Sequence, residues 1–260
     1  MGRALLIAWC LPCTLTGCAV YVPTVPSTPL LRAKGEVEAT AAIRSFSSLE
    51  AGAAWLPAGR LLVVGETALQ TSEGSETRNS ITTNYKNVHW QAGLGLGTYR
   101  LLGEKQATYL GALGGVGLAK AEVYGNNIES FFLIIPLFGP LVQYKASYLR
   151  YYGQVYVAQQ GPQVSYGLSV RSMLISYHKL LRNNTPIQSP NKFFLEPSLF
   201  VRVGRGPVQG IATLGLSLPG RTHLENPDSR KLAPSSSLIS VGVVVRPQLF
   251  RHREAAVVPE

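Results

Sequence analysis

Charged residues that recur at alternate positions are the groups in this chain best placed to do chemistry. Nine of them fall where a two-residue alternation puts them on one polar face: Glu36, Glu38, Arg44, Glu66, Arg150, Arg171, Glu196, Arg202 and Arg246. Both signs occur in similar number, so charges that share a narrow interior would pair with one another. The set is therefore either a structural ion-pair network that closes the interior, or the lining of a selective pathway or ligand site.

Catalytic and cofactor chemistry has little support in the sequence. The histidines, which are His89, His178, His223 and His252, show neither an HExxH motif nor a paired metal spacing. Ser176 and His178 would lie two residues apart on one strand face, too far for a direct hydrogen bond. Glycine runs near 93–97 and 111–117 precede no helical pattern, which argues against a nucleotide loop. We predict no catalysis, no cofactor and no metal.

The segments that carry the charges alternate apolar and polar residues. Between 164 and 171, Val164, Tyr166, Leu168 and Val170 alternate with Ser165, Gly167, Ser169 and Arg171. A period of two is typical of a strand with one apolar and one polar face. The same pattern predicts ten strands, at about 34–45, 48–56, 60–70, 85–99, 106–122, 141–157, 162–177, 193–203, 208–218 and 236–249.

The connections between these strands alternate in length. After the third strand, long segments (71–84, 123–140, 178–192 and 219–235) alternate with short ones (100–105, 158–161 and 204–207). An even number of antiparallel strands, with tight turns on one rim and long loops on the other, is typical of an outer-membrane barrel. The predicted fold is all-β: an antiparallel up-and-down β-barrel of about ten strands, within a range of eight to twelve.

The N-terminal region reads as an export signal followed by a spacer. Arg3 precedes an apolar run that ends at Leu15. The sequence Leu15-Thr16-Gly17-Cys18 resembles the lipobox of bacterial lipoproteins, which implies removal of residues 1–17 and lipidation of Cys18 by acyl chains such as palmitate. A plain signal peptide with a chance cysteine is the alternative. Residues 18–32 then comprise the lipidated cysteine and a stiff proline-rich spacer, residues 33–250 the barrel domain, and residues 251–260 a polar tail.

Two surface features predict contacts with partners. Residues 128–140 are unexpectedly apolar, and the candidate contacts with a partner or lipid are Phe131, Phe132, Ile134 and Ile135. Basic residues in the long connections could meet anionic lipopolysaccharide: Arg78, Lys86, Lys179, Arg182, Lys192, Arg221, Arg230 and Lys231. The net charge of +10 is spread thinly and accompanies no nucleic-acid-binding motif, so no nucleic acid partner is predicted.

Lipobox, proline spacer and the entry of Gly35-Glu36 into the first strand together resemble uncharacterised outer-membrane-barrel lipoproteins of the Bacteroidetes. That resemblance implies a lipid-anchored protein of the Gram-negative outer membrane, in contact with lipid through the Cys18 acyl chains and the barrel surface. The predicted function is a structural or interaction role in the cell envelope.

Two alternative functions stay open. One is a lipid-anchored periplasmic barrel that carries a lipophilic ligand as lipocalins do. The ten residues after Phe250 favour it, because outer-membrane barrels commonly finish on an aromatic residue. The other is an envelope-lipid hydrolase or acyltransferase, whose chemistry His89 and His178 near the long-loop rim would support.

Overall fold

A computed structural model describes residues 20–44, 47–78, 81–126, 141–188, 191–220 and 236–250. In chain order the strands are β1 (Val37–Arg44), β2 (Ser48–Ala58), β3 (Leu61–Arg78), β4 (Ile81–Leu102), β5 (Thr108–Asn126), β6 (Leu141–Gln160), β7 (Val164–Arg182), β8 (Thr185–Pro186), β9 (Lys192–Val203), β10 (Val208–Pro219) and β11 (Ser236–Val245). Ten long strands stand where the alternation predicts them, and β8 is an addition of two residues.

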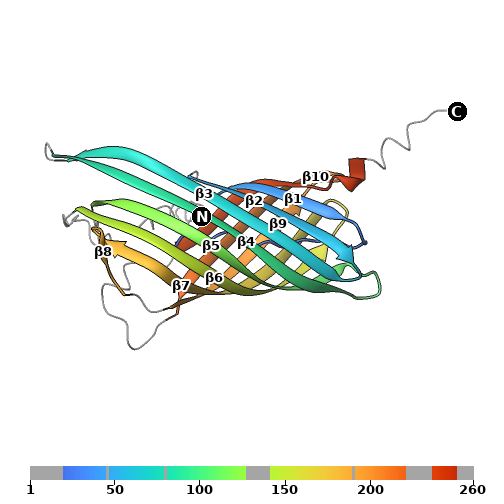
Figure 1. The fold of residues 1–260 in the computed structure, drawn as a ribbon. Coiled ribbons are helices and arrows are strands. Elements are labelled where there is room, and N and C mark those ends of the chain that lie inside the picture. The colour runs from blue at the N-terminus through green and yellow to red at the C-terminus, as the bar shows by residue number, and fades with distance from the viewer. Residues whose placement is uncertain are drawn as a thin grey trace, which may run out of the picture.

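The long strands close into a barrel. Consecutive strands pair antiparallel, and β1 also pairs with β11, which joins the two ends of the sheet. The short β8 pairs only with the end of β7 and lies outside the ring. Figure 1 shows the strands tilted across the barrel wall, as closure requires. Closure satisfies the backbone groups that an open sheet would leave at its edges, and it confirms the predicted all-β, ten-stranded antiparallel barrel.

The longest connections between strands all lie on one rim of the barrel. The tight-turn rim, as we call it, holds residues 59–60, 103–107, 161–163 and 204–207, and here β1 begins and β11 ends. Gly59 and Gly204 have φ angles of +51° and +135° in these turns, a backbone conformation that suits glycine. The opposite end, the long-loop rim, carries the long connections β5–β6, β7–β9 and β10–β11, and also the short connections β1–β2 and β3–β4, which span residues 45–47 and 79–80.

The prediction of a long loop at 71–84 is wrong. β3 and β4 continue through it as a paired hairpin, in register as far as Arg78 opposite Ile81. Threonines and serines recur in this stretch, and β-branched residues suit a strand. Lys86 and Glu73 face each other across the pair with Nζ and Oε1 2.6 Å apart, which adds a cross-strand contact.

Side chains alternate between an apolar outer face and an inner face that combines charged and polar groups with buried apolar and aromatic side chains such as Leu62, Met173 and Phe194. On β7 the side chains of Val164, Tyr166, Leu168 and Val170 are exposed, whereas Ser169 and Arg171 are buried inside the barrel. Other strands repeat the pattern, with Leu94 and Val241 exposed on the outside. The wall therefore has large apolar residues on the outside, the reverse of the usual globular arrangement.

Glycines on the inner face of β4 and β5 make room for large side chains from β6. A Cβ atom at Gly115 would lie 2.5 Å from the ring of Tyr152, and one at Gly111 would lie 2.2 Å from the ring of Tyr156. These are contacts that no alanine could accept without a shift of the ring or the wall. The glycine runs are therefore packing sites for inward-pointing tyrosines.

The only helical residues in the described part of the chain are 248–250, after β11. No helix among the described residues is long and apolar enough to cross a lipid bilayer.

Candidate functional site in the barrel lumen

The segment that precedes the barrel lies inside it. Residues 20–32, which we call the luminal segment, hydrogen-bond to inward side chains of β2, β4, β6, β7 and β9. Val20, Tyr21, Leu30 and Leu31 belong to the buried core. The sequence analysis predicts that these residues form a spacer between lipid and barrel, but in the structure they lie inside the lumen.

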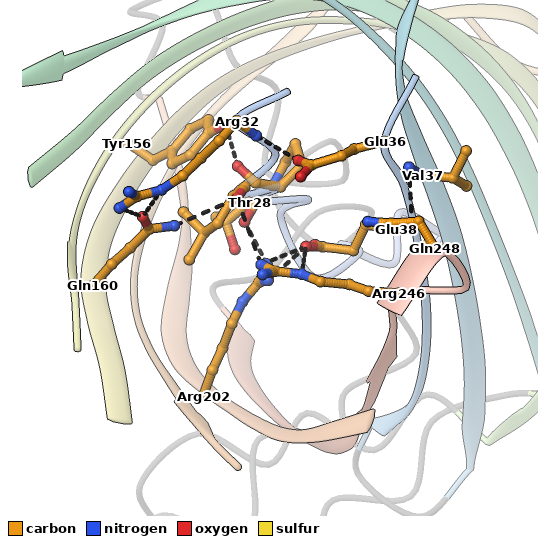
Figure 2. A network of polar contacts seen from close by, with 12 residues as sticks. Thr28, Arg32, Glu36, Val37, Glu38, Tyr156, Gln160, Arg202, Arg246 and Gln248 are labelled. Atoms are coloured by element: carbon orange, nitrogen blue, oxygen red, sulfur yellow. Dashed lines mark hydrogen bonds and ion pairs between the residues drawn. The ribbon is translucent and has the colours of Figure 1, made fainter. Parts of the chain in front are cut away.

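The luminal segment runs along the barrel from one end toward the other. At the tight-turn rim, the guanidinium of Arg32 donates to the side chain of Gln160 (Figure 2). It also donates to the backbone oxygen of Gln106. At its other end the ring of Tyr21 packs on Phe194, with centroids 4.3 Å apart. Phe194 lies two residues after the start of β9, and β9 starts at the long-loop rim. Val20 and Tyr21 therefore lie toward the long-loop rim.

Proline spacing makes the luminal segment rich in hydrogen-bond acceptors. Pro23, Pro26 and Pro29 recur every third residue, the period of a polyproline II helix, and each lacks an N–H group. The carbonyl oxygens accept bonds from wall side chains: Val22 from Gln91 (3.2 Å), Ser27 from Gln154 (2.6 Å) and Pro29 from the hydroxyl of Tyr156 (2.7 Å). The luminal segment thus offers many hydrogen-bond acceptors and few donors, which matches the hydrogen-bond donors on the long polar side chains of the wall.

One charge cluster lies deep in the lumen around Glu66. Its carboxylate oxygens lie 3.0 Å from Arg150 Nη2 and 3.2 Å from Arg171 Nη2. Both arginine side chains are fully buried, and both also donate to Thr24 Oγ1 of the luminal segment, at 3.2 and 3.1 Å. We call Glu66, Arg150 and Arg171 the deep triad. It joins β3, β6 and β7 to the luminal segment.

A second cluster of the same composition lies nearer the tight-turn rim. Glu38 Oε2 lies 2.9 Å from Arg202 Nη1 and 3.1 Å from Arg246 Nη2. Arg202 also donates to the carbonyl oxygen of Thr28 in the luminal segment. Figure 2 shows the two arginines converging on Glu38 beside Thr28. We call Glu38, Arg202 and Arg246 the rim triad.

The other predicted lumen charges have partners of different kinds. Glu196 accepts from the hydroxyls of Tyr21 (2.7 Å) and Ser217 (2.9 Å). Glu36 accepts from the backbone N–H of Arg32 at 2.6 Å. The nine residues therefore form several local clusters rather than one continuous network.

Sequence reasoning missed several residues of the site. Glu50 pairs with Arg44 (Nε to Oε1, 2.7 Å) and accepts from the backbone N–H of Val25 at 2.8 Å. Its place in the alternation of β2, two residues after buried Ser48, could have identified it as inward. Thr24 and Tyr21 could not be found in this way, because nothing in the strand pattern indicates that the luminal segment enters the barrel.

Tyrosines complete the lining on the side of β6. Tyr144, Tyr148, Tyr152 and Tyr156 are all buried on the inner face. Tyr156 also stacks with Tyr109 at 5.8 Å between centroids, and Tyr109 with Tyr99 at 4.8 Å. A cavity of about 50 Å³, room for one or two water molecules, remains beside the luminal segment, where Thr24, Thr28 and Arg202 are among the lining residues.

His89 and His178, the histidines of the described residues, do not share a site. His89 is buried on β4, where its Nε2 is in hydrogen-bond contact with Asn87 Oδ1. His178 is exposed on β7. No group of three histidine, cysteine or carboxylate side chains that could hold a metal occurs within the described part of the chain.

Several predicted contact residues lie outside the described residues: Cys18, Phe131, Phe132, Ile134, Ile135, Arg221, Arg230 and Lys231. Of the basic residues expected to meet lipopolysaccharide, Lys86 pairs with Glu73, Lys192 is buried and Lys179 is exposed.

No family model matches this sequence, and a search of curated proteins found no match. The resemblance to envelope lipoproteins therefore stays a prediction.

Proposed function

We propose that this protein is an integral outer-membrane β-barrel lipoprotein with a structural or interaction role in the cell envelope, and that its own luminal segment closes the barrel. The observation that carries the proposal is the distribution of side chains across the wall. Large apolar residues cover the outside, while arginines and glutamates are buried inside. Lipid is the solvent in which an apolar exterior of this kind is stable.

The contents of the lumen favour this proposal over a periplasmic carrier. A soluble barrel that carries a lipophilic ligand would turn its apolar faces inward around a cavity. Here the described inner face holds two arginine–glutamate triads and the luminal segment, and the cavity beside that segment has a volume of about 50 Å³. Drug-sized ligands occupy cavities of roughly 300–1,000 Å³, so the carrier is the weaker candidate.

The placement of the two histidines gives no support to the enzyme proposal. A hydrolase or acyltransferase that used His89 and His178 would need both side chains near one substrate. His89 faces the interior of the barrel and His178 is exposed.

The proposed lipid anchor is constrained by the luminal segment. Cys18 precedes Val20 by two residues, a span of at most about 7 Å, and Val20 is fully buried toward the long-loop rim. An acyl chain on Cys18 would therefore reach lipid over the long-loop rim and not beside the start of β1. Outer-membrane lipid, and lipopolysaccharide near the basic long connections, are the partners of this proposal.

The proposal predicts how the chain partitions without its lipid anchor. A Cys18→Ser chain, exported with an unlipidated signal, should still require detergent and run faster on a gel unheated than heated, because the barrel surface itself is apolar. Membrane fractionation and the heat-dependent gel shift measure this. Release of the variant as a soluble monomer would contradict the membrane barrel.

A further inference from the structure

The luminal segment presents uncharged oxygens to charged groups. From Val20 to Leu31 it contains no charged side chain. Even so, Thr24 Oγ1 accepts from both Arg150 and Arg171, and the carbonyl oxygens of Thr28 and Leu30 accept from Arg202 and Arg246. Neutral acceptors occupy positions where a negatively charged oxygen would bind a guanidinium more strongly.

Each triad combines two arginines with one glutamate. Glu66 is shared by two arginines in the deep triad, and Glu38 is shared by two in the rim triad. Arg44 and Glu50 form a one-to-one pair. Glu196 accepts from two hydroxyl groups, but it also lies opposite Arg171 in the pairing of β7 with β9 and adds a carboxylate beside the deep triad. Two guanidinium clusters therefore follow one another along the luminal segment: the rim triad, which keeps a surplus positive charge, and the deep triad, whose second arginine faces Glu196.

Guanidinium donors in this region also lack acceptors. Arg150 Nε, Arg202 Nε and Arg44 Nη2 are buried without a hydrogen-bond partner among the described residues. A buried donor without an acceptor costs free energy, so these N–H groups would gain from a ligand that carries several oxygens. Arg202 also lines the cavity beside the luminal segment.

We propose that the lumen is an oxyanion-binding passage whose ligand sites the luminal segment occupies. Its ligand class is a small solute that bears phosphate or carboxylate groups, because paired guanidinium groups recognise both. The rim triad would receive the anion at the tight-turn rim and the deep triad would hold it in the interior, as rings of basic side chains do in anion pores. This inference rests on the proposed membrane barrel.

The test is ion conduction with and without the luminal segment. The Cys18→Ser chain and the same chain lacking residues 20–31 are inserted into planar bilayers across a KCl gradient. The barrel of the intact chain should conduct no ions. The shortened chain should conduct, its reversal potential should shift toward that of chloride, and inorganic phosphate should reduce the chloride current.

Matched variants assign the anion preference to the triads. In the shortened chain, the triple variant E38Q/R202Q/R246Q removes one net positive charge together with all three charges of the rim triad. It should lose phosphate block and most of the chloride preference. Arg205→Gln removes one positive charge from an exposed turn and should leave both properties unchanged.

A second route avoids dependence on how the shortened chain folds. A protease site inserted after Lys34, in the exposed turn before β1, allows the segment to be cut after the intact barrel has folded. Cleavage followed by washing with phosphate should open the same chloride-selective conductance.

The outcomes separate the two proposals. A full-length Cys18→Ser chain that stays soluble contradicts the membrane barrel itself. A second set of outcomes concerns a chain that is inserted in the membrane, as its heat-dependent gel shift shows. If that chain does not conduct once the segment is removed, or if it conducts potassium in preference to chloride, or if phosphate does not reduce its current, the oxyanion passage alone is contradicted.

Discussion

Replacing Glu66 with glutamine is expected to lower the free energy of unfolding by about 3–5 kcal/mol, because the change leaves two buried guanidinium groups without their counter-charge. Glu66 lies 3.0 and 3.2 Å from the deep-triad arginines, whose side chains are 0% exposed. The glutamine oxygen can still accept one hydrogen bond, but it cannot offset two buried positive charges. Urea titration in detergent, followed by tryptophan fluorescence, measures the difference.

The matched control for this variant is Glu73→Gln. Glu73 pairs with Lys86 at 2.6 Å, but the two side chains are 53% and 50% exposed on the hairpin beyond the barrel. An exposed pair contributes at most about 1 kcal/mol. If Glu66→Gln were no more harmful than Glu73→Gln, the deep triad would have no role in holding the barrel together.

An arginine placed at Leu168 should destabilise the folded protein in lipid by about 2–4 kcal/mol. Leu168 points outward from β7 and is 53% exposed. It lies four residues from the tight-turn end of the strand. A membrane-spanning strand crosses the hydrocarbon layer with about ten residues, so Leu168 would lie near the middle of that layer. The cost comes from placing a charge at the depth of the acyl chains, and unfolding from lipid vesicles measures it.

Val164→Arg is the control at the edge of the same outer face. Val164 is the first residue of β7 and is 44% exposed. An arginine there reaches the interface and should cost about 0–1 kcal/mol. In a water-soluble barrel both positions face solvent, so two equally small effects would argue against contact with lipid.

The barrel could be predicted from the sequence because its signal is local. Along β7, residues 164–171 alternate in polarity, and the structure exposes the apolar set and buries Ser169 and Arg171. Each strand carries this information by itself, so ten strands and their faces follow from the pattern. The hairpin at 71–84 was missed because its sequence lacks the alternating apolar residues that make a strand visible.

The luminal segment could not be predicted, because its position depends on long-range contacts. Prolines 23, 26 and 29 indicate an extended chain without donors, which fits a spacer as well as an insert. Gln154 and Tyr156, which hold the segment, lie more than a hundred residues away in the chain. The charges on the inner wall were recognised individually, but the oxygens of the segment that bind them were not.

Quenching of tryptophan fluorescence by lipids with brominated acyl chains tests the central claim most directly. With Trp9 removed in the predicted signal, Trp55 and Trp90 are the remaining tryptophans, and their side chains are 49% and 40% exposed on the outside of the barrel. In vesicles of brominated lipid, the refolded Cys18→Ser chain should lose most of its tryptophan emission relative to unbrominated vesicles, and single Trp→Phe variants should show that both positions contribute. Equal emission in the two kinds of vesicle would mean that the apolar outer face does not meet acyl chains, and the membrane barrel would have to be abandoned.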